Sequence, residues 1–270
     1  MNGVNQDFHT YLLIDNGLLQ QIAAGYTEVK SKSRPTWLSP IYAERALDVS
    51  PFLVDIEAAY EAGGLDQVMC FWNACKPALH VSIIETHLDI QRITQHLRRF
   101  IFICNPDGKQ FTLRYSDCTV LMLLSLLLTP TQWGAMRGPM RRWGVHDRVG
   151  MIKQLPKVQS NIRASTPFDL ELTQLAALNE ASEPDHVIAK VKMMRHGAKL
   201  PGNAEEQYTW AQAARKRWQQ EKISDPLILI YLTEATILSR GTVLAKSEVS
   251  GFLAMGQVCT IREKLIRLTD

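Results

Sequence analysis

The sequence lacks the cysteine pattern of a secreted, disulfide-bonded protein. Its 270 residues include five cysteines, at positions 70, 75, 104, 118 and 259, and no two of them form a Cys-x-x-Cys pair. The disulfide frameworks of small secreted domains are denser and usually contain an even number of cysteines. The pattern therefore predicts reduced thiols, buried in apolar segments of a cytoplasmic protein.

Long apolar runs are also missing. The longest one, Val120–Leu128, has nine residues and includes Ser125, whereas a membrane-spanning helix needs about 20. The first ten residues, MNGVNQDFHT, contain neither the basic nor the apolar part of a signal peptide. We therefore expect no membrane insertion and predict a cytoplasmic location.

An excess of one charge is lacking as well. The chain has 30 Lys and Arg residues against 27 Asp and Glu residues, for a net charge of +3. The first 150 residues contain 14 of each sign, so the whole excess follows residue 150, where 16 basic residues face 13 acidic ones. A nucleic-acid-binding domain usually has a stronger basic bias, and the composition as a whole predicts no nucleic-acid partner.

The stretch 137–163 is an exception to this balance, with seven Lys or Arg residues against one acidic residue. We call six of its side chains the basic stripe: Arg137, Arg141, Arg142, Arg148, Lys153 and Lys157. A basic stripe can bind phosphates, with the nearby Trp133 and Trp143 as stacking partners for bases. Alternatively, the charges are solvated or contact a protein, and both tryptophans pack on the core. A nucleic-acid-binding module that uses this stripe is therefore the alternative function.

Common catalytic motifs are absent: there is no nucleophile elbow, phosphate-binding loop, dinucleotide fingerprint or zinc-protease helix. Cys70, Cys75 and His80 are evenly spaced, whereas structural zinc sites take their ligands in tight pairs. Asp55 and Glu57 alternate at a strand end, either as paired carboxylates for acid–base chemistry or as solvated residues where the strand gives way to a helix. We therefore expect no enzyme, metal or cofactor, although a hydrolase whose carboxylates meet in a cleft stays a third possibility.

The first half of the chain alternates short strands and helices. Apolar runs predict strands at Thr10–Asp15, Pro51–Ile56 and Ala78–Glu85, and helical spacing predicts helices at Leu18–Ala24, Leu65–Cys75 and His87–Phe100. Residues 31–40 read as a loop. The turn Asn105-Pro106-Asp107-Gly108 joins two short strands, Ile101–Cys104 and Gln110–Tyr115, into a hairpin. This order predicts a mixed sheet with helices packed on it.

The second half is predicted to be helical. The expected helices are Phe168–Ala181, Asp185–His196, Ala204–Lys222, Pro226–Leu238 and Thr260–Leu268, and Pro167, Pro184 and Pro226 stand at first helical positions. We therefore predict an α/β (α+β) N-terminal lobe at 1–150, with a mixed sheet flanked by helices. A basic connector at 151–164 and a mainly α-helical C-terminal lobe at 165–270 follow.

The stretch 96–143 reads HLRRFIFICNPDGKQFTLRYSDCTVLMLLSLLLTPTQWGAMRGPMRRW. It resembles the family catalogued as domain of unknown function 4123, the adaptor or chaperone proteins of bacterial type VI secretion. The resemblance is carried by a helix that ends in HLRR, a hairpin, an Arg-aromatic-x-Asp element, an apolar helix, and Gly-Pro before a Trp. The Tyr11–Asp15 strand and Ser50-Pro51 also fit, so the similar region covers residues 9–145. In one departure, Cys118 stands where the family usually has Pro.

The resemblance implies ten signature or partner-binding residues: Arg98, Arg99, Arg114, Tyr115, Asp117, Gly138, Pro139, Arg141, Arg142 and Trp143. Asp117 precedes the apolar helix Thr119–Leu128, where its carboxylate can cap free backbone N–H groups. Arg114 can reach that carboxylate or a carbonyl group. Both residues either organise this corner alone or take part in a partner-binding groove, and the choice stays open.

The resemblance also implies a function. Members of the family bind a secreted effector protein in the cytoplasm of a Gram-negative bacterium and help to load it onto the VgrG spike or the PAAR-type tip protein. This work is binding, without a chemical reaction or a cofactor, and it requires apolar effector segments to be covered and later released. The C-terminal helices are expected to choose the cargo, and five of their residues form either an adaptable apolar face or core: Met193, Met194, Trp210, Trp218 and Tyr231.

Overall fold

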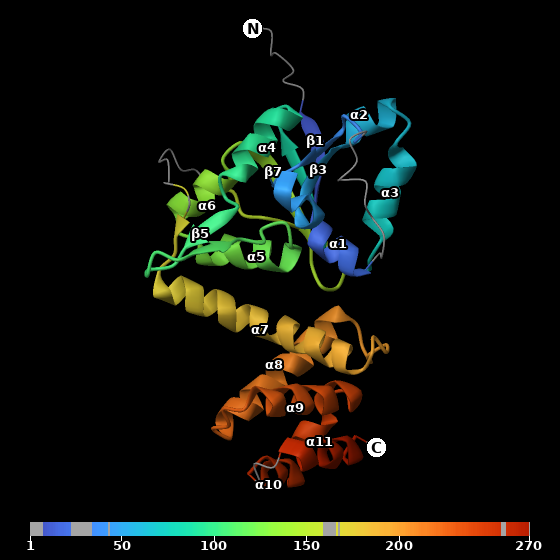
Figure 1. Cartoon of the computed structure of the whole chain (residues 1–270), viewed down its shortest axis with the longest axis vertical. Coiled ribbons are helices and arrows are strands. Elements are labelled where there is room, and N and C mark those ends of the chain that lie inside the picture. The colour runs from blue at the N-terminus through green and yellow to red at the C-terminus, as the bar shows by residue number, and fades with distance from the viewer. Residues whose placement is uncertain are drawn as a thin grey trace. The chain divides into compact units, whose positions relative to one another are not determined.

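The computed structural model describes residues 8–22, 34–42, 44–158, 166, 168–254 and 258–269. The chain folds as two compact units, Met1–Leu178 and Asn179–Asp270. The first unit combines sheets with flanking helices, and the second is helical (Figure 1). The predicted fold class is therefore confirmed. Within the described residues, no helix is both long and apolar enough to cross a membrane.

A six-stranded antiparallel sheet forms the centre of the first unit, with the strand order β2-β3-β1-β4-β7-β8. Its strands are β1 His9–Ile14, β2 Leu38–Pro40, β3 Phe52–Asp55, β4 Val81–Thr86, β7 Met140–His146 and β8 Ile152–Gln154. The three strands predicted before residue 90 correspond to β1, β3 and β4.

The central strands of this sheet are buried under helices on both faces, which explains the unbroken apolar run of β1. Successive strand side chains point to opposite faces, so Tyr11 and Leu13 belong to one core cluster and Leu12 and Ile14 to the other. Figure 1 shows helices along both faces. On the Leu12 side lie α1 Asn16–Ile22, α2 Ile56–Glu61 and α3 Leu65–Asn73; on the Tyr11 side lie α4 Ile90–Arg98, α5 Cys118–Leu127 and α6 Pro130–Arg137.

A smaller sheet has the order β6-β5-β9 and consists of β5 Phe102–Cys104, β6 Gln110–Thr112 and β9 Phe168–Asp169. The predicted hairpin is β5 with β6. Strand β9 pairs with β5 in parallel, so among the described strands the mixed pairing is confined to this small sheet.

Strand β9 corrects the helix predicted from Phe168. The Phe168 ring lies 5.1 Å from that of Phe100, and its backbone pairs with Ile103. These contacts with distant residues override the local helical spacing, and the helix begins only at Leu172.

The first unit extends beyond the lobe predicted at 1–150, because β8 pairs with β7 and β9 pairs with β5. Residues 152–154 of the predicted connector are therefore part of the main sheet. Four predicted stretches lie outside the described residues: the end of the first helix (23–24), the start of the first loop (31–33), the end of the connector (159–164), and Pro167.

The helices of the C-terminal region are α7 Leu172–Met194, α8 Ala204–Gln220, α9 Pro226–Leu238, α10 Glu248–Ala254 and α11 Val258–Arg267. A 3-10 segment, η3, follows α9 at Thr242–Ala245, and another, η2, lies in the first unit at Glu44–Val49. Helix α7 begins in the first unit and ends in the second. It joins two predicted helices into one, so Pro184 lies inside a helix and not at its start. Pro lacks the N–H that would bond four residues back. Near Pro184, the carbonyl of Ala181 accepts a hydrogen bond from the Tyr208 hydroxyl at 3.0 Å. In the turns of α7 that follow Pro184, Val187 and Val191 are buried in the core of the second unit.

Pro226 begins α9, as predicted. The Asp225 carboxylate accepts a hydrogen bond from Leu227 N at 2.8 Å, and Pro226 occupies the first turn of α9. Four of the five apolar residues singled out in the C-terminal helices pack partly buried against the two cores of this unit: Met194, Trp210, Trp218 and Tyr231. Met193 differs, since 78% of it is exposed.

Candidate functional site

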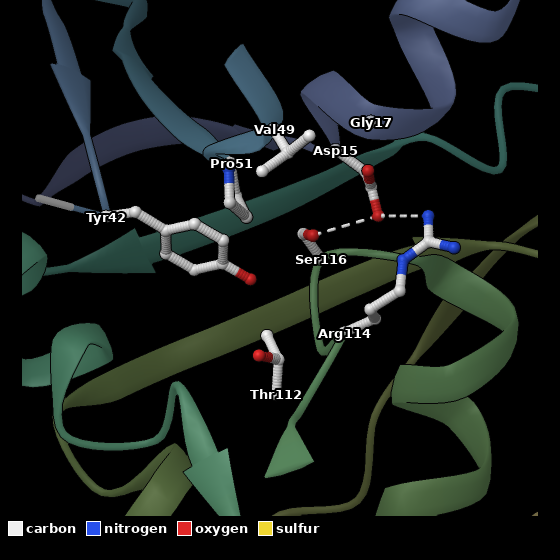
Figure 2. Close-up of a pocket in the computed structure, with 8 residues that line it drawn as sticks. All are labelled: Asp15, Gly17, Tyr42, Val49, Pro51, Thr112, Arg114 and Ser116. Carbon is white, nitrogen blue, oxygen red and sulfur yellow. Dashed lines mark hydrogen bonds and ion pairs between the residues drawn. The ribbon is translucent and has the colours of Figure 1, made fainter. Parts of the chain in front are cut away.

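A cavity of about 330 Å³ opens in the first unit at the end of β1 (Figure 2). Parts of the chain that are far apart in sequence meet there: the β1–α1 corner, the segment around η2, and the segment that runs from β6 to α5. Eight residues line the cavity: Asp15, Gly17, Tyr42, Val49, Pro51, Thr112, Arg114 and Ser116.

Asp15 is the buried acid of this pocket, with 4% of its side chain exposed. Its Oδ2 accepts hydrogen bonds from Arg114 Nη2 at 3.1 Å and from Ser116 Oγ at 3.0 Å. Its Oδ1 accepts from Leu18 N at 3.0 Å, in the first turn of α1. A Cβ on Gly17 would lie 3.2 Å from that same oxygen, so the glycine keeps this turn close to the carboxylate. A buried carboxylate with this many donors is fully compensated.

Arg114 is the basic partner, and 47% of its side chain is exposed. Burial by itself lowers the pKa of its guanidinium, but the carboxylates of Asp15 and Asp117 outweigh burial and hold the pKa above its usual value. Only Nη2 is bonded to a described residue, which leaves the other guanidinium N–H groups available. The expected partner was Asp117 or a carbonyl group; the ion pair with Asp15 corrects this prediction, because the fold brings the end of β1 to the segment before α5.

Tyr42 forms the opposite wall, with its hydroxyl directed into the pocket (Figure 2). Its backbone N–H donates to Ser50 Oγ at 2.8 Å, and Ser50 Oγ donates to Pro51 O at 2.7 Å. Burial and the nearby Asp15 carboxylate raise the pKa of Tyr42 to about 12, so the hydroxyl stays a hydrogen-bond donor at neutral pH. Among the described residues, none bonds to this hydroxyl. The sequence contains no local signal for Tyr42, whereas Ser50-Pro51 and the strand ending at Asp15 belong to the family resemblance.

Asp117 caps α5, as predicted. Its Oδ1 accepts from Thr119 N at 2.9 Å and from Thr119 Oγ1 at 2.7 Å, and burial raises the pKa of its carboxyl group. Cys118, at the position where the family has Pro, is buried and donates from Sγ to Val81 O at 3.1 Å. Burial raises the pKa of this thiol to about 12. Cys118 therefore anchors the helix start to β4 and is not a nucleophile at neutral pH.

Two further signature residues, Tyr115 and Arg98, hold α4 in place, and a third, Arg99, lies at its end. Tyr115 is buried and donates from its hydroxyl to Leu97 O at 3.0 Å. Arg98 donates from Nε to Ile41 O at 2.9 Å and from Nη2 to Pro40 O at 3.1 Å. The guanidinium of Arg99 lies over the Phe100 ring, 5.5 Å from its centroid.

The remaining signature residues surround the start of β7. Gly138 ends α6, and the carbonyl of Pro139 accepts from Thr86 Oγ1 at 2.7 Å. Trp143 is buried, donates from Nε1 to Ser82 Oγ at 3.1 Å and stacks on Trp133, with ring centroids 6.0 Å apart. None of these groups lines the pocket.

The side chains of the basic stripe have different partners in the structure. Arg137 is buried and donates to the carbonyls of Met140 and Arg141, and Arg141 lies over the Phe8 ring. Arg142 pairs with Glu85 at 3.5 Å, and Lys153 pairs with Asp147 at 3.7 Å. Since Trp133 and Trp143 are buried, they follow the core alternative and do not offer stacking surfaces for bases.

The residues considered for acid–base chemistry or metal binding make contacts within the fold. Asp55 caps α2 through Ala58 N at 3.0 Å, and Glu57 pairs with His9 at 3.5 Å. The buried His80 donates from Nε2 to Phe71 O at 2.7 Å, and the described residues contain no group of side chains that would hold a metal ion. The prediction of buried thiols is right for Cys118 and wrong for Cys70, which is exposed; Cys75 and Cys104 are partly buried.

The second unit has a polar site that the sequence did not reveal. Glu234 is fully buried in α9 and accepts from Arg262 Nε at 2.8 Å, Arg262 Nη2 at 2.9 Å and Arg195 Nη1 at 3.1 Å. Burial by itself raises the pKa of Glu234, but the bonds from both arginines outweigh burial and hold it below the usual value. A shallow cavity of about 380 Å³ beside this triad also borders Glu263 and Arg267.

Residues 10–135 match the family described as "Domain of unknown function (DUF4123)". All eight residues that line the pocket lie within this range, whereas the signature residues from Gly138 to Trp143 lie beyond it. No curated protein and no solved structure matches the chain. The chain therefore contains, at residues 10–135, a domain of the family described as domain of unknown function DUF4123.

Proposed function

We propose that this chain is a non-enzymatic adaptor, or chaperone, that binds a type VI secretion effector and promotes its loading onto the VgrG spike or PAAR-type tip protein. The proposal places the chain in the cytoplasm of a Gram-negative bacterium. The effector and the spike or tip protein are its partners, and no cofactor takes part. It extends to this chain the role that the family resemblance implies.

One observation carries the proposal: the polar groups of the pocket suit binding better than group transfer. The single carboxylate, Asp15, is already bonded to Arg114, Ser116 and a backbone N–H group. The Ser116 hydroxyl donates to that carboxylate, and none of the eight lining residues is a histidine, cysteine or lysine that would activate a nucleophile. Tyr42 and Arg114 retain donors that bond to no described residue, and such donors can recognise a partner's acceptor groups.

Co-expression tests the proposal. The tagged chain is produced together with the products of its neighbouring genes, purified, and analysed by size-exclusion chromatography with light scattering. We expect a stoichiometric complex with an effector-like or a spike-like protein. If neither protein associates with the chain, the adaptor function is wrong.

A salt series on the purified chain separates this proposal from the nucleic-acid alternative. Binding to nucleic acid weakens steeply as salt rises, because counterions are released. A largely apolar protein interface loses much less affinity over the same range. Salt-sensitive binding of a DNA or RNA duplex, without any protein complex, would favour the alternative.

A further inference from the structure

Among the described strands, β6 is paired on one side only. It is the outer strand of the small sheet, and all three of its residues are exposed. Leu113 N donates to Ile101 O at 2.7 Å, and Asn105 N donates to Lys109 O at 2.9 Å. In and beside β6, the odd-numbered residues therefore direct their backbone N–H and C=O groups toward β5.

The backbone groups between these bonds must therefore point the other way. In an antiparallel pair, alternate residues direct their N–H and C=O groups away from the partner strand. Gln110 and Thr112 are these residues in β6, and no described residue bonds to their outward groups. An edge of this kind can accept an additional strand.

The same edge leads into the pocket. Thr112, the last residue of β6, lines the cavity together with Tyr42 and Arg114 (Figure 2). The Tyr42 hydroxyl and several N–H groups of Arg114 bond to no described residue, so they can donate to the acceptors of a ligand. Val49 and Pro51 supply an apolar wall beside them.

The charge balance of the pocket indicates which kind of acceptor fits. The Arg114 charge is compensated by Asp15 at 3.1 Å, so a second carboxylate here would also face the negative charge of Asp15. A neutral acceptor avoids this repulsion. The carbonyl oxygens of a peptide backbone are neutral acceptors, and an extended peptide also supplies the N–H groups that a strand edge requires.

We propose that β6 and the pocket together bind an extended segment of a partner protein. The segment adds a strand to β6 through the backbone of Gln110 and Thr112 and places its backbone carbonyl groups against Tyr42 and Arg114. This inference rests on the proposed adaptor function and deepens it, because it defines the partner element as an uncharged, extended peptide.

Two substitutions test the inference without disturbing the fold. Thr112→Pro removes an N–H group that points away from β5, so the β5–β6 pairing is kept, while Thr112→Val keeps that N–H and changes only the side chain. Tyr42→Phe removes a hydroxyl that has no described partner, and Tyr60→Phe, at an exposed site in α2, is its matched control.

Affinity is measured by biolayer interferometry against the effector-like or spike-like protein recovered by co-expression. We expect Thr112→Pro to weaken binding on the order of tenfold or more and Tyr42→Phe by roughly three- to tenfold, as for the loss of one hydrogen bond. Thr112→Val and Tyr60→Phe should stay within about twofold of the unsubstituted chain. Hydrogen exchange should slow at the amides of Gln110 and Thr112 in the complex. A stable complex with unchanged exchange and unchanged affinities would overturn this inference and leave the adaptor function standing.

A second measurement does not depend on the neighbouring genes. A displayed library of random linear peptides is selected on the full chain, and the enriched peptides are tested on the four variants. Peptides that lose binding to Thr112→Pro and Tyr42→Phe, and keep it with both controls, support the site even if no neighbouring product binds. Failure to enrich such peptides overturns it.

Discussion

Asp15 and Arg114 are 99 positions apart in the sequence and form an ion pair of 3.1 Å in which the carboxylate is buried and the guanidinium is half-exposed. The pair ties the end of β1 to the segment that enters α5. It also sets the charge balance of the pocket, because the one acid and the one base that line it neutralise each other.

Removing Arg114 should destabilise the first unit. Arg114→Ala leaves the Asp15 carboxylate buried with fewer donors, and we expect a loss of about 1–2 kcal/mol in the free energy of unfolding. This is less than the ~3–5 kcal/mol for a fully buried pair, because solvent reaches the guanidinium. Urea denaturation measures the loss. The control Arg142→Ala breaks the more exposed pair with Glu85 and should cost less than about 0.5 kcal/mol; equal losses would contradict the prediction.

The cap of α5 should depend on the side-chain oxygen of Asp117 and not on its charge. Asp117→Ala removes the acceptor for Thr119 N and should cost about 1 kcal/mol of stability. Asp117→Asn keeps an acceptor and should remain within about 0.5 kcal/mol, because burial already disfavours the charged form and raises the pKa. Thermal unfolding of both variants tests this, and an Asn variant as unstable as the Ala variant would show that the charge matters.

Glu234 should be among the most sensitive positions of the second unit. Glu234→Gln leaves the guanidinium groups of Arg195 and Arg262 without their counter-charge, and we expect a loss of about 1–2 kcal/mol, because solvent reaches both guanidinium groups. Glu263→Gln is a matched control, because Glu263 borders the same cavity but is exposed. Chemical denaturation that shows similar, small losses for both variants would argue against a structural role of the triad.

The same carboxylate predicts how acid affects stability. The folded-state pKa of Glu234 lies below its usual value, so the unfolded chain binds this proton more readily. The stabilisation is fully present above the unfolded pKa of about 4.3 and is lost as pH falls through the folded pKa. Stability curves below pH ~5 should therefore be steeper for the unsubstituted chain than for Glu234→Gln; parallel curves would contradict this.

The partly buried His96 should make the first unit sensitive to milder acid. Burial lowers the pKa of His96, whose Nε2 donates to Met136 O at 2.7 Å. The unfolded chain therefore binds the proton first, and stability that is present above about pH 6.5 declines as pH falls below it. His96→Gln keeps a side-chain N–H donor and should flatten the decline between about pH 6.5 and 5. The exposed His186→Gln should leave the decline unchanged, and a similar flattening in both would refute the assignment.

Local patterns were sufficient for elements that rest on contacts close in sequence. The apolar run of β1, the Pro-Asp-Gly turn of the β5–β6 hairpin and the Asp225-Pro226 start of α9 all appear where they were predicted. In each case a short segment contains both the periodicity and the residue that starts or ends the element.

Strand β7 shows where local patterns fail. It reads MRRWGVH, and its two arginines and glycine resemble a surface connector. It is nevertheless an inner strand of the main sheet, because it pairs with β4 on one side and β8 on the other and buries Trp143 against Trp133. The pairing partner β4 precedes it by more than fifty residues, and no local pattern encodes that contact.

The sequence by itself determined the fold class, the family and the cap at Asp117, because these depend on composition, spacing and neighbouring residues. Only the tertiary structure decided what Arg114 binds and that Tyr42 faces it across a pocket. The reason is physical: the order of the strands determines which strand ends meet, and strand order follows from long-range pairing and burial on both faces of the sheet. The pocket therefore arises from residues that have no relationship to one another until the sheet has formed.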